Sequence, residues 1–155
     1  MSHQDQYIDG TAVAVAGAAV LIMGTSGSGK STLALDLMSR GAELVSDDKV
    51  LARRIGEQVV LSAPQTIAGM IEARGVGLLA VRYCEARLKL IVDLDAEETA
   101  RLPQQTESIC GVTFPLIRAR GRHRIAGTVM VTLCNDFHPE TMSIHQPARD
   151  KDRNR

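Results

Sequence analysis

Residues 24–31 carry the clearest chemical signal in this chain. They read Gly-Thr-Ser-Gly-Ser-Gly-Lys-Ser, the complete Gly-x-x-x-x-Gly-Lys-Ser/Thr pattern of a phosphate-binding loop. Glycines let the backbone curl so that consecutive N–H groups point at one phosphate, and the following helix adds the positive end of its dipole. Lys30 would reach the β- and γ-phosphates, and the Ser31 hydroxyl would bind the accompanying magnesium. The residues expected to bind the nucleotide are Gly24, Thr25, Ser26, Gly27, Ser28, Gly29, Lys30, Ser31 and Thr32.

The sequence on both sides of the loop supports this prediction. Ala18–Met23 is a continuous apolar run, typical of a strand that is buried on both faces. Ser31–Arg40 gathers four apolar residues on one helical face and is followed by Gly41, a common helix stop. Because strand, loop and helix are the context that the motif needs, they favour a nucleotide site over a glycine-rich turn that binds nothing.

Two adjacent carboxylates follow another apolar segment. Asp47 and Asp48 come directly after Leu44-Val45-Ser46, so we expect them at the carboxyl end of a strand, where ligands bind in open α/β sheets. One carboxylate can hold the magnesium shell while the other accepts a proton from an attacking hydroxyl, as phosphoryl transfer requires. The alternative is a solvated pair that caps a turn.

The segment Ile71–Gly77 combines an acid, a cation and two glycines. Glu72 could bind the metal directly or through water, and Arg74 could neutralise charge on a transferred phosphoryl group. A salt bridge between the two side chains at a turn would explain the segment equally well.

Composition restricts the possible partners. The 155 residues suit one domain, and 18 acidic and 18 basic side chains cancel, so no overall field attracts nucleic acid or an anionic membrane. Trp is absent and there are two Phe and two Tyr, which disfavours a base-stacking surface. The longest apolar stretch, residues 12–23, is too short to span a bilayer, and three unpaired cysteines favour a reducing compartment. We therefore expect a cytoplasmic protein without nucleic-acid or membrane partners.

Apolar strands alternate with helical segments, which predicts an α/β fold: a single P-loop-containing domain with a mostly buried sheet flanked by helices. We expect this domain over residues 1–145 and a disordered charged tail over 146–155. The expected strands are Thr11–Ala16, Ala18–Met23, Glu43–Ser46, Gln58–Ala63, Gly77–Val81 and Arg87–Leu94. The expected helices are Ser31–Arg40, Gln65–Ile71, Ala96–Leu102 and Ile125–Phe137.

Three segments, residues 24–35, 40–50 and 71–79, resemble in order and spacing the catalytic domain of HPr kinase/phosphorylase. The Asp-Asp pair and the Glu-x-Arg-Gly-x-Gly pattern that begins at Glu72 are hallmarks of that family, and the resemblance covers most of residues 9–135. It is closest to the short form, which lacks the amino-terminal domain of longer members. By this resemblance Lys30 corresponds to the phosphate-binding lysine, Ser31 and Glu72 to the magnesium ligands, and Asp48 to the proton acceptor, with Asp47 beside it.

The resemblance further implies an enzyme that uses ATP and Mg²⁺ to phosphorylate a serine of HPr, the phosphocarrier protein of the sugar phosphotransferase system, and reverses the reaction with inorganic phosphate. It leaves ATP and GTP undistinguished as donors. Arg101 falls where the family has a catalytic arginine, and Arg120–His123 matches a basic loop used in dephosphorylation. The family's hexameric assembly predicts a homo-oligomer.

Two departures from the family pattern are visible. Asp9 stands where the family has a His, and the basic segment Arg118–Arg124 lacks the family's proline-containing approach. Both bear on docking of the substrate and on the reverse reaction. A P-loop kinase or NTPase that acts on another substrate, and a nucleotide-binding regulatory module without catalysis, are the alternative functions.

Overall fold

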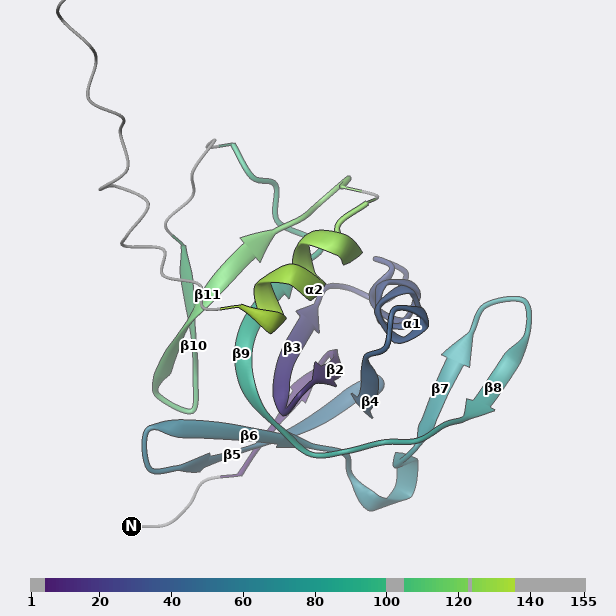
Figure 1. Cartoon of the computed structure of the whole chain (residues 1–155), viewed down its shortest axis with the longest axis horizontal. Coiled ribbons are helices and arrows are strands. Elements are labelled where there is room, and N and C mark those ends of the chain that lie inside the picture. Colours follow the sequence, from purple (N-terminus) through teal and green to yellow (C-terminus); the bar gives the residue numbers. More distant parts are fainter. Residues whose placement is uncertain (1–4, 100–104, 123, 136–155) are drawn as a thin grey trace, which may run out of the picture.

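The structure is a computed structural model that describes residues 5–99, 105–122 and 124–135. Its main sheet has nine strands in the order β1-β5-β6-β9-β3-β2-β4, with β11 beside β9 and β10 beside β11, and β7 and β8 form a separate hairpin (Figure 1). The strands are β1 (Gln6–Asp9), β2 (Thr11–Val15), β3 (Ala18–Met23), β4 (Glu43–Ser46), β5 (Lys49–Ile55), β6 (Gln58–Ser62), β7 (Met70–Ala73), β8 (Gly77–Ala80), β9 (Ala86–Asp93), β10 (Thr106–Ile109) and β11 (Val112–Arg118). The helices are α1 (Lys30–Ser39), α2 (Ala126–Cys134) and the 3₁₀ turn η1 (Gln65–Ile67).

The parallel strands β3 and β9 form the centre of the sheet. Their middle residues, Val20–Ile22 and Leu90–Val92, are fully buried, as continuous apolar runs in a sheet covered on both faces should be. The first residues of β9 pair with β6, and its last three pair in parallel with β11. The carboxyl ends of β3, β9 and β11 therefore lie at the same edge of the sheet, where the α/β fold places ligands.

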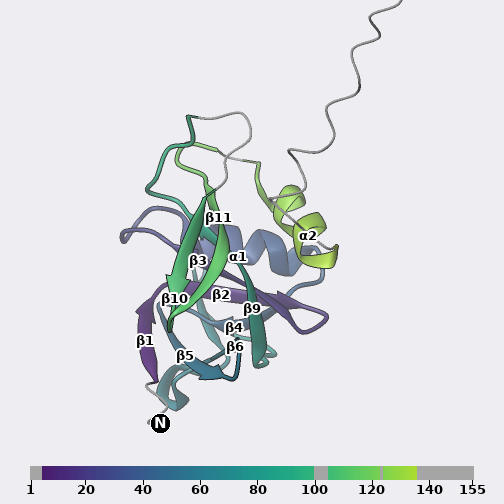
Figure 2. The ribbon, with the colours of Figure 1, turned by 90° about the vertical axis from the view of Figure 1, so that its left-hand side faces the viewer.

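Each face of the central strands packs against a different layer. Val20 and Ile22 face the two helices and join Leu37 of α1 and Val129 of α2 in one core cluster. Leu21 points the other way, into a cluster built from β5, β6, β10 and β11. Figure 2 shows these strands wrapping around the face opposite the helices. The predicted α/β domain with a mostly buried sheet is confirmed, with both helices on one face and strands over the other.

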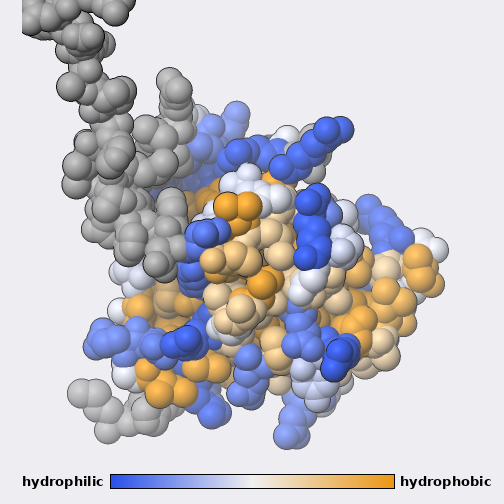
Figure 3. Space-filling model, in the orientation of Figure 1, coloured by the Kyte–Doolittle hydropathy of each residue, from blue (hydrophilic) through white to orange (hydrophobic). Residues whose placement is uncertain are grey.

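The β7–β8 hairpin lies apart from the main sheet, beside α1 (Figure 1). Ile71 and Ala73 point inward and are buried, and Ile71 joins the core cluster under the helices. On the outer side Met70, Val76 and Leu78 are exposed. Apolar surface is visible over this hairpin in Figure 3.

The end of α2 is held by a side chain from the sheet. Lys89 Nζ of β9 donates hydrogen bonds to the carbonyl oxygens of Leu133 at 3.0 Å and Asn135 at 2.7 Å. Because the last carbonyls of a helix have no partner within it, a cation placed there satisfies them and interacts favourably with the helix dipole. This contact fastens α2 to the central strand.

Most expected elements are present within a residue or two of their predicted ends, but β1, β5, β7, β10 and β11 were not predicted. The expected helix Gln65–Ile71 is wrong: η1 ends at Ile67 and β7 follows. The expected helix Ala96–Leu102 is wrong over residues 96–99, where the chain turns because Asp93 Oδ1 accepts hydrogen bonds from the amides of Asp95 and Ala96. The helix expected over Ile125–Phe137 ends earlier than predicted, at Cys134, and Asn135 after it has an extended backbone. The rest of the helix expected over Ala96–Leu102 and the tail 146–155 lie outside the described residues.

Candidate active site

The phosphate loop connects the end of β3 to the start of α1, as predicted. Gly29 is the N-cap of α1 and has φ of 101°, a left-handed conformation that favours glycine. At Gly24, a Cβ atom would lie 2.4 Å from Ser28 Oγ and 3.0 Å from Ser28 Cβ, so a side chain there would force Ser28 to shift. The loop therefore places its backbone against the positive end of α1, which is the arrangement that binds anions.

Lys30 lies across this loop. Its Nζ donates hydrogen bonds to the carbonyl oxygens of Gly24 at 2.7 Å and Thr25 at 3.2 Å. These contacts hold the ammonium group at the mouth of the loop, within the cavity that the loop lines. The position is the one expected for a lysine that meets the terminal phosphates of a nucleotide.

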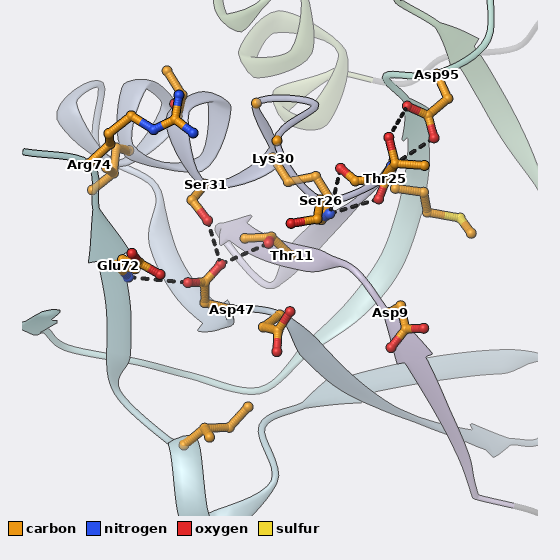
Figure 4. A pocket seen from close by; sticks show the side chains of 18 of the residues that line it. Asp9, Thr11, Thr25, Ser26, Lys30, Ser31, Asp47, Glu72, Arg74 and Asp95 are labelled. Carbon is orange, nitrogen blue, oxygen red and sulfur yellow. Dashed lines mark hydrogen bonds between the residues drawn. The ribbon is translucent and has the colours of Figure 1, made fainter. Parts of the chain in front are cut away.

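Asp47, at the end of β4, is the most constrained carboxylate of the site (Figure 4). Oδ1 accepts hydrogen bonds from the hydroxyls of Ser31 at 2.8 Å and Thr11 at 2.9 Å, and Oδ2 accepts one from the Glu72 amide at 3.2 Å. The residue is only 9 % exposed. A charge in such a position must be hydrogen-bonded to be tolerated, and here three donors from three elements fix its orientation.

Asp48 differs from its neighbour. It is exposed, has φ of +71°, and sits in the tight turn between β4 and β5. Its carbonyl oxygen accepts a 3.0 Å hydrogen bond from the Gly10 amide, while its carboxylate makes no hydrogen bond to another described residue. Asp48 lines the same cavity as Lys30, so its carboxylate is available to a substrate.

Glu72 and Arg74 also line this cavity. Both are exposed, and both come from the β7–β8 hairpin. They form no ion pair with each other within the described part of the chain. The phosphate loop, the acid pair and the hairpin thus border one cavity of about 1040 Å³, and the sequence segments singled out separately meet in space.

Two contributors to the site were not anticipated from the sequence. Thr11 is fully buried and orients Asp47. Asp95, just beyond β9, accepts hydrogen bonds from both the amide and the hydroxyl of Thr25 in the phosphate loop. A signal for Asp95 was present, because an acid directly after a buried strand is the same pattern that indicated Asp47.

Asp9 lies at the rim of the cavity and forms a salt bridge with Lys49 of β5. The hydrogen bond and charge of Lys49 lower the pKa of the Asp9 carboxyl, and the charge of Lys30 lowers it further. Asp9 correspondingly raises the pKa of Lys49. The negative charge at the position of the family's His is thus partly compensated by a neighbouring cation.

The start of the basic segment lies at the same edge of the sheet. The amide of Ala119 donates to the carbonyl of Asp93 at 2.8 Å, and the amide of Arg120 donates to that of Ala96 at 2.9 Å. Arg101, the expected catalytic arginine, and His123 lie outside the described residues.

The donor set suits magnesium. Ser31, Asp47 and Glu72 offer hydroxyl and carboxylate oxygens, the hard ligands that Mg²⁺ prefers, and few of them. No group of three or more His, Cys, Asp and Glu side chains with metal-binding geometry occurs among the described residues. Magnesium that arrives with nucleotide phosphates needs only one or two protein ligands, so the site fits a nucleotide-bound ion.

Comparison with known proteins agrees with the geometry of this site. The model of the HPr serine kinase C-terminal domain matches residues 2–119. The chain belongs to this family.

Individual members of the HPr kinase family are similar over much of the chain. An HPr kinase/phosphorylase of Prosthecochloris aestuarii is 36% identical over 130 residues, covering 74% of this chain and 38% of that protein. One from Verminephrobacter eiseniae is 34% identical and covers 91% of this chain and 52% of that protein. The HPr(Ser) kinase/phosphatase structure from Coxiella burnetii matches with a TM-score of 0.68 and 27% identity, over 83% of this chain and 88% of that one. The chain thus spans about half or less of these two curated relatives.

Neither helix in the described part of the chain has the length and apolarity needed to cross a membrane.

Proposed function

We propose that this chain is the catalytic domain of an ATP- and Mg²⁺-dependent serine kinase/phosphorylase that acts on the phosphocarrier protein HPr. The hydrogen-bond network at Asp47 is the observation that best supports this proposal. It links Ser31, at the end of the phosphate loop, to Glu72 of the β7–β8 hairpin. It unites the three motif segments by which the chain resembles the HPr kinase family. The names of its relatives support the choice of reaction.

In the kinase direction, the loop amides and Lys30 hold the β- and γ-phosphates. Ser31 and Asp47, with Glu72 beside them, would hold Mg²⁺, which neutralises charge on the phosphates. Asp48 accepts the proton of the attacking serine hydroxyl as its oxygen bonds to the γ-phosphorus and ADP departs. In the reverse direction, inorganic phosphate attacks phosphoserine and yields serine and pyrophosphate, and Asp48 returns the proton.

The rim of the cavity favours a protein as acceptor. Met70 and Leu78 line the cavity beside Glu72 and are exposed to solvent. Exposed apolar side chains next to a reactive site indicate a surface that a partner protein covers. We further propose that the enzyme works as a homo-oligomer, a hexamer in the family, and in the cytoplasm.

Asp9 favours a second candidate, a kinase of the same mechanism with a different protein acceptor. The family's His is replaced by a carboxylate that is bound to Lys49, so the rim of the cavity differs in charge and shape from the family pattern.

Incubation with γ-labelled ATP, Mg²⁺ and HPr, followed by mapping of the labelled residue, tests the proposal. Label on a single serine of HPr, lost with Asp48→Asn, supports it. Nucleotide binding without label on HPr would reject HPr as the acceptor, and parallel incubation with a lysate of the host would then reveal another labelled protein. Absence of nucleotide binding would reject the kinase altogether.

A further inference from the structure

Asp95 contacts the phosphate loop in a way that the reaction itself does not require. Its Oδ2 accepts a hydrogen bond from the Thr25 amide at 2.7 Å, and its Oδ1 accepts one from the Thr25 hydroxyl at 3.0 Å. Both oxygens of the carboxylate are therefore used on one residue (Figure 4). Asp95 lies in the turn after β9, far along the chain from the loop, and that turn is fixed by Asp93.

Thr25 in turn holds other residues of the phosphate loop in place. Its carbonyl oxygen accepts hydrogen bonds from the Ser28 amide at 3.0 Å and from Lys30 Nζ at 3.2 Å. The carboxylate of Asp95 thus holds the amide and the hydroxyl of Thr25. The carbonyl oxygen of Thr25 in turn holds the Ser28 amide, which curves the loop, and the ammonium group of Lys30. Asp95 acts on Lys30 through this one residue.

The charge of Asp95 works against anion binding. A carboxylate at the edge of a site for a triphosphate repels the ligand, because like charges interact unfavourably across a short distance. Asp95 carries this cost at a position where a neutral acceptor would avoid it. Its geometry is explained if the two charge-assisted hydrogen bonds, which are stronger than neutral ones, hold the loop in its binding conformation.

We propose that Asp95 is a positioning residue that preorganises the phosphate loop for nucleotide by holding Thr25 at its amide and hydroxyl. This inference rests on the proposed function, because it takes the loop to be the nucleotide site. By this proposal the Asp95 side chain strengthens nucleotide binding, although its negative charge by itself would weaken it. Removing the side chain should weaken nucleotide binding, whereas removing a negative charge alone should strengthen it.

The test measures the affinity of the whole chain for ATP with Mg²⁺ by titration calorimetry. Asp95→Ala should weaken binding about ten-fold, the usual effect of losing hydrogen bonds to a charged group. Thr25→Val removes the hydroxyl donor and should give part of that loss. Asp95→Asn loses an acceptor as well as the charge, because its NH₂ group faces a donor of Thr25, and should also give part of the loss. Thr25→Ser, which keeps the hydroxyl, should lose less affinity than Thr25→Val.

Glu97→Ala is the matched control, since Glu97 is an exposed acid in the same segment and makes no hydrogen bond to another described residue. It should bind ATP as well as or slightly better than the original protein. The Asp95→Ala and Thr25→Val effects should be less than additive when combined, because both act on one contact. Thermal unfolding without nucleotide should change little in any of these variants, and the stabilisation by ATP should shrink with affinity.

The outcomes separate the two proposals. If the original protein does not bind ATP, the proposed function fails. If it binds ATP and Asp95→Ala binds equally well or better, Asp95 has no positioning role. If Asp95→Ala lowers the unfolding temperature without nucleotide and leaves the ATP affinity unchanged, the contact is structural only and the inference is overturned.

Discussion

Ser31 Oγ donates a 2.8 Å hydrogen bond to Asp47 Oδ1, which joins the first turn of α1 to the end of β4. The next residue, Asp48, is exposed and its carboxylate has no hydrogen-bond partner among the described residues. The two neighbouring acids therefore have different environments, and replacing each should have a different result.

Asp48→Asn should lower the rate of phosphoryl transfer by roughly 10²- to 10⁴-fold, the usual contribution of a general base, because the amide cannot accept the proton. ATP affinity should stay within about two-fold, since the Asp48 carboxylate makes no hydrogen bond to the loop among the described residues. Steady-state kinetics and calorimetry check both. Asp47→Asn is the comparison. It should weaken the binding of Mg²⁺ and lower the stability of the fold, as well as the rate of phosphoryl transfer. The reverse pattern would make Asp47 the base.

Lys30→Ala should reduce transition-state stabilisation by about 2 to 4 kcal/mol, because one cation that meets the developing charge is lost. Folding should persist, since Lys30 makes its hydrogen bonds to two carbonyls of the loop and none to the core. The ratio of kcat/KM values measures the effect. Equal kcat/KM values in the variant and the original protein would show that the loop is not part of the active site.

The Asp9–Lys49 pair controls the charge at the rim. Asp9→Asn should release the ammonium of Lys49 and tighten binding of inorganic phosphate, an effect that salt should screen. The double variant Asp9→Asn/Lys49→Met should lose the gain. Phosphate titration at low and high ionic strength measures both. Weaker phosphate binding in Asp9→Asn would mean that the carboxylate itself serves the site.

The same pair gives stability a defined pH dependence. Lys49 holds the pKa of Asp9 below its ordinary value of 3.8, so this contribution to folding is present at neutral pH. This contribution is lost as the pH falls below 3.8 and passes the lower pKa that Asp9 has in the folded protein. Denaturant titrations of the original protein and Asp9→Asn should therefore converge in acid. Curves that stay parallel through that range would contradict the assignment.

How much of this site follows from the sequence depends on how local each signal is. The loop, β3 and α1 are encoded by contiguous residues, and all three are in place. β5 was missed although its two buried residues, Val50 and Ala52, are two positions apart, which is the spacing of a half-buried strand. Leu51 between them hides the polar alternation that would have indicated a strand. β11 contains Pro115, which disfavours a strand on local grounds. It lies opposite Thr106 of β10, and the parallel pairing of β11 with β9 begins only at the next residue, Leu116.

The contacts of Thr11 and Asp95 could not be read from spacing in the same way. Thr11 meets Asp47 only because β2 lies between β3 and β4 in the sheet. A buried threonine in an apolar strand gives no sign of its partner. Pairing order depends on the whole set of strands, which local patterns do not specify.

Lys89→Met should lower the free energy of unfolding by about 1.5 to 3 kcal/mol, because two carbonyls at the end of α2 lose a charged donor. Urea denaturation measures the loss. Arg87→Met, an exposed change on the same strand, is the control and should have little effect. Equal effects from both would indicate that strand charge, rather than the helix contact, matters.

Cys84 should resist alkylation at pH 8. Burial, together with the hydrogen bond and charge of Glu43, raises the pKa of its thiol to about 11, so little thiolate exists there. Iodoacetamide should modify the exposed Cys134 first, and Glu43→Gln should speed modification of Cys84. Peptide mass spectrometry over time gives both rates. Faster reaction at Cys84 than at Cys134 would contradict the assigned environment.

The central position of β9 also has a consequence for synthesis of the protein. The phosphate loop and α1 leave the ribosome long before β9, yet β3 gains its parallel neighbour, and Thr25 its partner Asp95, only when that strand has emerged. Pairings between distant segments form slowly, since the intervening chain must first be ordered. A nascent chain ending before β9 should therefore expose its apolar β3 and depend on chaperones, and nucleotide should protect the chain only after β9 is complete.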